Sequence, residues 1–322
     1  MTKLSRFAVV LLALPLGAFA ADPTLLQMIM PDAQVVAGLE VDSAKSSLFG
    51  QYVLSHLSVN DTKLEQFTAE TGFDPRRDVS EVVIASNWKQ DSPDSRWIVA
   101  AHGTFDIPSI TAAAQTNGGV IAPYQGVNVL THAASGKSQV VTGLAFLNSS
   151  TALLGDLTSV QAAISRSQSN AAINSAVLAK AQTASAGKDF WFVTLVPLSN
   201  FSSSVPVLNN SGAASGNVFA AINQASGGIH FGDTVTISAE AVTRSEKDAQ
   251  ALVDVVKFFA SLVQLNRQNN PAAGQVATLL DTLQTTVSGN ITTLSLAIPE
   301  QQIEQLLNSK HPTATKASVQ IN

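Results

Sequence analysis

Histidines are the residues of this chain best suited to acid–base or metal chemistry. The chain has five of them: His56, His102, His132, His230 and His311. None occurs in HxH or HExxH spacing, the local patterns that bring neighbouring imidazoles onto one metal ion. His102 and His132 lie on or beside expected strands of one unit, so the fold can bring these two together. We expect hydrated or hydrogen-bonded strand histidines and assign no metal ligand.

Phosphate binding and serine hydrolysis have no complete motif. Ser135-Gly136-Lys137-Ser138 matches the end of a phosphate-binding loop, but position 131, where the motif needs glycine, is Thr131. The segment QVVTGLAFL that follows is typical of a strand, so a hairpin turn is expected here. No G-x-S-x-G sequence occurs. Glu40 and Asp42 are the nearest pair of carboxylates, and the end of a strand explains them. We therefore predict no catalytic residue and no cofactor.

The segment GFDPRRDVSEVV, residues 72–83, places two arginines between two aspartates. Gly72 is suited to end a helix, Asp74 to cap a short turn, and Pro75 to occupy its first position. Arg76 and Arg77 then have carboxylates within reach at a hydrated surface, where an ion pair contributes ~0–1 kcal/mol. An anion-binding role for the arginines is the alternative. We interpret the segment as a structural connector that leads into a strand.

The first twenty residues predict export. A basic start with Lys3 and Arg6 precedes an apolar run shorter than the ~20 residues that a membrane-spanning helix needs. Ala18-Phe19-Ala20 fits a signal-peptide cleavage site, so cleavage is expected between Ala20 and Ala21. An uncleaved membrane anchor is the alternative. No other segment is apolar and long enough to cross a membrane. The expected location is periplasmic or extracellular.

Composition excludes several classes of function. The chain of 322 residues has no cysteine, which removes thiolate zinc sites, iron–sulfur clusters and thiol nucleophiles. Its net charge of −5 becomes −7 when Lys3 and Arg6 leave with the signal segment. Without clustered lysine and arginine, nucleic acid is not an expected partner. Charged residues make up 13%, against a usual ~25%, so the surface is polar and weakly charged.

The order of expected elements occurs twice along the chain. Both copies show a strand, then a pair of strands, then a capped helix; compare VAAHGTFDIPSITAAAQ with ISAEAVTRSEKDAQALVDVV. We predict a signal peptide at 1–20, a first unit at 21–170, a second unit at 171–309 and a polar tail at 310–322. The expected fold class is α+β: two related units, each a mainly antiparallel sheet with helices packed on one face.

Three aromatic residues follow one another at the start of the second unit. Alternation along a strand sends Trp191 to the face opposite Phe190 and Phe192. We expect a strand that is buried on both faces, and a ligand-stacking surface is the alternative.

The long helix expected at Ser245–Asn266 is unusually apolar. A second apolar stripe, which includes Val255, Phe258, Leu262 and Leu265, lies beside the first. Together the two stripes span about 240° of the helix, whereas a helix lying on a surface needs only ~100°. One interpretation places this helix between the two units. The other makes these four residues an interface or ligand contact, with an oligomer, an apolar ligand or a membrane surface.

Four segments together resemble a group of exported bacterial proteins that has no characterised activity. They are PDAQVVAGLEV (31–41), GFDPRRDVSEVV (72–83), GTFD (103–106) and Tyr124-Gln125-Gly126-Val127. The resemblance covers most of the first unit and less of the second. It implies export and the α+β fold, and it supplies no catalytic residue.

These observations favour a non-enzymatic structural or interaction role in the periplasm or outside the cell. The alternative is a carrier that holds a small apolar ligand between the two units, against the long helix. A third hypothesis is a hydrolase, which would need His102 near an acidic residue and a nucleophilic serine or threonine.

Overall fold

The computed structural model describes residues 21–57, 62–89, 92, 94–132, 141–169, 176–201, 218–267 and 271–310. The predicted signal segment, the SGKS turn and the tail beyond residue 310 lie outside these ranges. Within them, none of the helices has the length and apolar character needed to cross a membrane.

The chain combines strands and helices, and its sheet is antiparallel, in agreement with the predicted α+β class. The strands are β1 (Val35–Glu40), β2 (Val79–Ser86), β3 (Trp97–Gly103), β4 (Val120–Tyr124), β5 (Val127–His132), β6 (Thr142–Asn148), β7 (Thr151–Asp156), β8 (Phe190–Thr194), β9 (Ile222–His230), β10 (Thr234–Thr243), β11 (Gln284–Ser288) and β12 (Ile291–Pro299). The helices are α1 (Pro23–Met28), α2 (Val41–Ser46), α3 (Leu48–Leu57), α4 (Thr62–Thr71), α5 (Pro75–Asp78), α6 (Ile107–Thr116), α7 (Leu157–Ser167), α8 (Ala176–Ser185), the 3-10 helix η1 (Leu198–Phe201), α11 (Glu246–Leu265), α12 (Pro271–Leu280) and α13 (Glu300–Lys310).

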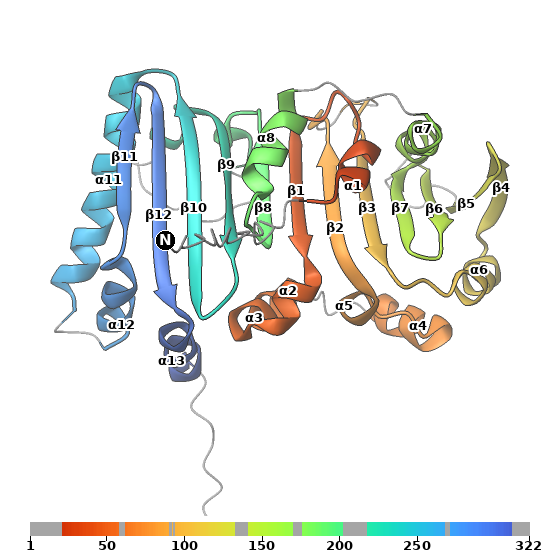
Figure 1. The fold of residues 1–322 in the computed structure, drawn as a ribbon, viewed down its shortest axis with the longest axis horizontal. Helices are drawn as coiled ribbons and strands as arrows, with labels where there is room; N and C mark the ends of the chain where they lie inside the picture. The colour runs from red at the N-terminus through yellow and green to blue at the C-terminus, as the bar shows by residue number, and fades with distance from the viewer. Residues whose placement is uncertain are drawn as a thin grey trace, which may run out of the picture.

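All twelve strands belong to one open antiparallel sheet (Figure 1). Its order is β11-β12-β10-β9-β8-β1-β2-β3-β7-β6-β5-β4. The sequence predicts a separate sheet in each unit, and here the structure differs. β1 pairs with β2 and β8 pairs with β9, which leaves one edge of each strand without a neighbour in its own unit. These two edges pair with each other, Val35 opposite Thr194 and Leu39 opposite Phe190, so neither is left unpaired.

Helices cover both faces of the sheet, not one as predicted. Alternate residues along β8 show the two faces: Trp191 packs in the core formed with α1, α7 and α8, whereas Phe192 packs in the cluster that contains Leu252 of α11. The two faces are named here the α8 face and the α11 face. The predicted alternation of Trp191 against its phenylalanine neighbours is confirmed, and Trp191 is 1% exposed.

The α8 face carries the largest core of the molecule. Its helices are held by side chains at their ends: Asp22 caps α1, Asp156 caps α7, and Arg166 of α7 donates from Nη2 to the carbonyl oxygen of Met28, 2.6 Å away, at the end of α1. Asp156 also accepts a hydrogen bond from the backbone nitrogen of Trp97 at 2.8 Å, which ties α7 to β3. Short polar links of this kind fix the small helix α1 on the sheet.

The α11 face is divided between two groups of helices. In Figure 1, α2 to α6 lie along one end of the strands, and α11 to α13 lie at the side of the sheet formed by β11 and β12. α11 therefore does not sit between the two units, as one interpretation of its sequence proposed. Its first half buries Ala249, Leu252 and Val253, and its second half extends beyond the sheet and leaves apolar side chains exposed.

Candidate functional site

The most distinctive feature of the α11 face is an open apolar pocket of about 510 Å³. Its floor consists of side chains from β1, β2, β3, β7 and β6, and its end wall comes from α2, α3, α5 and α6. The lining residues are Leu39, Val41, Leu54, Phe73, Pro75, Arg76, Val79, Val82, Val99, Ala101, Phe105, Ile110, Leu144, Phe146, Ala152 and Leu154. All of them except Arg76 are apolar.

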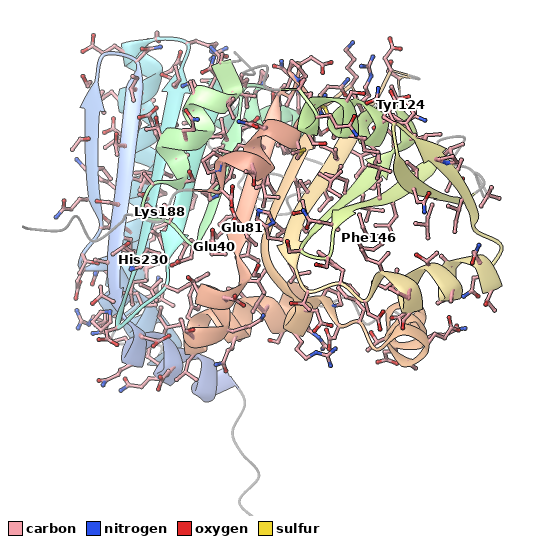
Figure 2. The ribbon with its side chains drawn as sticks, turned by 45° about the vertical axis from the view of Figure 1, so that its right-hand side comes forward. Glu40, Glu81, Tyr124, Phe146, Lys188 and His230 are labelled. Atoms are coloured by element: carbon pink, nitrogen blue, oxygen red, sulfur yellow. The ribbon has the colours of Figure 1, made fainter. Side chains whose placement is uncertain are left out.

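Strand alternation explains why this pocket is apolar. On β7, Leu153 belongs to the buried core of the α8 face, and its neighbours Ala152 and Leu154 point to the pocket. Both faces of β7 are therefore apolar, as in a strand of a sheet covered on both sides. Part of the α11 face nevertheless has no cover among the described residues: Ile84 is 47% exposed and Leu154 is 39% exposed. Phe146, labelled in Figure 2, marks this part of the sheet.

The segment GFDPRRDV forms one rim of the pocket. Asp74 caps α5 by accepting from the backbone nitrogen of Arg76, and Pro75 occupies the first turn, as predicted. The Arg76 guanidinium binds both oxygens of Asp74 at 3.0 and 2.9 Å, and Arg77 binds Asp78. These hydrogen bonds hold the pKa of Asp74 and of Asp78 below its usual value. Both arginines have internal carboxylate partners, which leaves the pocket without an uncompensated charge at this rim.

A pair of carboxylates, Glu40 and Glu81, lies on the opposite face of the sheet. The two residues are directly opposite each other in the β1–β2 pair, and Figure 2 labels them side by side at its middle. Their side chains hydrogen-bond, and burial together with the neighbouring Glu81 raises the pKa of Glu40 to about 7. Burial also raises the pKa of Glu81. One proton is therefore shared between them near neutral pH, because two ionised carboxylates in contact repel each other.

His102 lies next to this pair and has the neighbours that the hydrolase hypothesis needs, an acidic residue and threonine hydroxyls. Its Nε2 is 3.2 Å from Asp22 Oδ2 and 3.2 Å from the Thr24 hydroxyl, and its Nδ1 is 3.2 Å from the carbonyl oxygen of Ser150. A carbonyl oxygen and a carboxylate only accept, so the ring donates from Nδ1 to Ser150 or from Nε2 to Asp22. The Thr24 hydroxyl donates to Asp22 Oδ1 at 2.7 Å and not to the histidine. The Thr151 hydroxyl lies 3.3 Å from Nδ1, on the nitrogen opposite Asp22 as a triad would require, but its side chain is buried and closed to a substrate. We interpret the group as a hydrogen-bond network that fixes α1.

The same network explains the electrostatics of Asp22. Burial raises the pKa of this carboxyl, but hydrogen bonds from Thr24 and the nearby His102 outweigh burial and lower the pKa overall. Its backbone nitrogen donates to Glu81 Oε1 at 2.9 Å. The start of the described chain is thus attached to the carboxylate pair.

A hollow of about 490 Å³ with a mixed polar and apolar lining lies elsewhere on the α8 face, beside α8. Hydroxyl groups of Thr183, Ser226 and Ser238 line it, with Lys180 and Glu240. Its floor is a flat region of β9, β10 and β12. It lacks the buried, converging polar groups that would define a ligand.

The structure separates the candidate residues of the sequence. Phe258, Leu262 and Leu265 of α11 are 59%, 38% and 76% exposed, Val255 is half-buried, and none of them lines the apolar pocket. His230 Nδ1 lies 2.9 Å from Asp189 Oδ2. The side chains of His56 and His132 lie outside the described residues. Among the described side chains, no group of three or more histidines and carboxylates is arranged to hold a metal ion.

Comparisons with known proteins give no family. No family model and no curated protein matches the chain. A solved structure titled "Structure of crystal form I of TP0453" aligns with a TM-score of 0.48 and 9% sequence identity, over 90% of this chain and 99% of the other. A similarity of this strength carries no argument about function. The resemblance to exported bacterial proteins stays a prediction.

Proposed function

We propose that this protein is an exported bacterial protein that holds a small apolar ligand in the pocket of the α11 face. The pocket itself carries the proposal: its volume of about 510 Å³ falls within the roughly 300–1,000 Å³ of typical ligand sites, and its lining is apolar except for Arg76. The predicted signal peptide supports an extracytoplasmic location. The proposed site lies within the first unit and not between the units against α11, where the sequence had suggested it.

The chemistry of the rim favours a neutral apolar ligand or acyl chain over a ligand anchored by charge. Arg76 and Arg77 are engaged by Asp74 and Asp78, so an anionic group would have to displace a bidentate ion pair. Binding would bury the exposed part of Leu154, which lines the pocket. Removing apolar surface from water stabilises a complex by roughly 25 cal/mol per Å² before the costs of association are subtracted.

The first test of the carrier function is a charge placed in the pocket. Leu154→Glu puts a carboxylate on a partly exposed lining position, so the fold can accept it while an apolar ligand cannot pair with it. We expect the dissociation constant of a fluorescent fatty acid to rise at least about tenfold, because an unpaired charge against apolar groups is costly. Fluorescence titration measures this change.

Leu48→Glu is the matched control, because Leu48 is 51% exposed and does not line the pocket. It should bind the probe as the wild type does. Native mass spectrometry of protein from its own host should also show a bound apolar molecule that denaturation releases. If neither the probe nor a native ligand binds, the carrier function is wrong.

A structural or interaction role, the first function that the sequence suggested, is favoured by a different observation, the exposed apolar side chains of α11. We also propose that the two units are related by duplication. The strand order supports this relation, since β1 and β8, the first strands of the two units, are neighbours and the other strands of each unit continue outward from them.

A further inference from the structure

We propose that the edge of the molecule formed by β11 and α11 is a homodimer interface. In this dimer β11 pairs antiparallel with β11 of a second copy, and the exposed apolar side of α11 packs against its counterpart. The inference is independent of the apolar pocket.

The two edges of the sheet differ in their protection. β4, at one edge, contains Pro123, which has no N–H to donate and blocks part of that edge. β11, at the other edge, has the sequence QTTVS, with neither proline nor charge, and β12 is its one neighbour in the sheet. Among the described residues no strand pairs with its outward N–H and C=O groups, so another strand can pair there. Natural proteins usually protect such an edge, which argues that this one is covered.

The apolar side of α11 lies at this same edge. α12 covers the other side of the helix: Gln264 Nε2 donates to the carbonyl oxygen of Ala277 at 3.1 Å and to Asp281 at 2.9 Å. Leu262 precedes Gln264 by two residues, about 200° around the helix, and so faces away from α12. Figure 1 shows α11 extending along the sheet edge beyond β11. Phe258 lies four residues before Leu262 and Leu265 three residues after it, so all three are exposed on the same side of the helix.

The surface is complementary to itself, as a two-fold interface requires. With the axis at Thr286, Gln284 of one copy lies opposite Ser288 of the other, and Thr285 lies opposite Val287. No like charges meet in this register. Asp281, just before the strand, already contacts Gln264 and lies 4.0 Å from Arg267.

The size of a stable interface explains why both elements are needed. Stable complexes bury roughly 1,200–2,000 Å² with about 20–30 residues on each side. A pair of five-residue strands is too small alone, and an isolated helix face does not fix a register. Strand pairing supplies orientation, and Phe258, Leu262 and Leu265 supply apolar area.

The test is the mass of the protein in solution. The full gene product, purified as its host processes it, is measured by sedimentation equilibrium over a wide micromolar range, together with Thr286→Lys and Phe258→Glu. We expect a wild-type dimer. Thr286→Lys sets two ammonium groups against each other at the axis, so its dimer dissociation constant should rise roughly a hundredfold. Phe258→Glu should weaken the dimer through the helix without touching the strand.

Val120→Lys is the matched control, since Val120 is 63% exposed on the opposite edge strand. It should leave the dimer unchanged, and all variants should keep the wild-type circular dichroism spectrum. A wild type that is monomeric throughout the range would overturn the proposal. So would a dimer that both interface variants leave intact, or a monomer that binds phospholipid vesicles through Phe258.

Discussion

Replacing Gly38 with alanine is expected to lower the free energy of unfolding by about 3 kcal/mol. Gly38 lies directly opposite Trp191 where β1 pairs with β8. A Cβ atom at position 38 would lie 2.5 Å from three atoms of the indole ring. Trp191 is 1% exposed and packed in the main core, so the ring has no free space to move into. The substitution therefore strains the contact that joins the two halves of the sheet.

Chemical denaturation monitored by circular dichroism measures this effect, and two further variants make it specific. Gly143→Ala in β6 is the matched control. Its new Cβ would lie 3.4 Å from its nearest neighbours, side-chain atoms of Leu157 and Val129, which is an ordinary contact distance. It should change the free energy of unfolding by less than about 1 kcal/mol. Adding Trp191→Phe to Gly38→Ala should recover part of the loss, since a smaller ring leaves room for the methyl group. Equal losses for Gly38→Ala and Gly143→Ala would contradict the argument.

Sequence patterns predicted the long, regular elements of this fold and missed the short ones. Apolar periodicity and the Ser245 cap predicted α11, and alternation predicted that Trp191 and Phe192 face opposite ways. The short edge strand β4 was missed, because its proline is typical of loops. The edge strand β11, which begins at Gln284 shortly after α12 ends at Leu280, was missed as well. QTTVS contains no alternation of apolar and polar residues strong enough to mark a strand.

The candidate site was less predictable because register and strand pairing create it. Glu40 was read as the end of a strand, and nothing local places Glu81, forty-one positions later, directly opposite it. The pocket likewise combines residues of β1, β2, β3, β6 and β7 with residues of α2, α3, α5 and α6, which are far apart in the sequence. The one local signal was that these strands are apolar at both odd and even positions, which is typical of a sheet covered on both faces. That signal indicates that both faces of these strands are buried, but it does not indicate what covers each face.

The carboxylate pair makes the stability of the protein fall as pH rises through a defined window. The pKa of Glu40 is about 7 in the folded state, against an ordinary value of 4.5 for a glutamate side chain. The folded state therefore holds this proton more tightly than the unfolded state. Below about pH 4.5 both states are protonated and the contribution is fully present; it is lost as pH rises to about 7. Glu40 is partly exposed, so the full shift is discounted to about 1–2 kcal/mol.

Glu40→Gln should remove this loss. The amide keeps the shape of the side chain and its hydrogen bond to Glu81 but never ionises. We expect the variant to be more stable than the wild type by about 1–2 kcal/mol at pH 8, and this advantage should disappear near pH 4. Urea denaturation at closely spaced pH values gives the difference curve, which should titrate between about pH 4.5 and 7.

Glu240→Gln is the control. Glu240 lies on the same face of the sheet as Glu40, but the residues opposite it on the neighbouring strands are Ser226 and Thr293, so it has no carboxylate partner there. It should leave the slope of the curve in this window unchanged. A Glu40→Gln variant that is equally destabilised at pH 5 and pH 8 would show that the two glutamates do not share a proton.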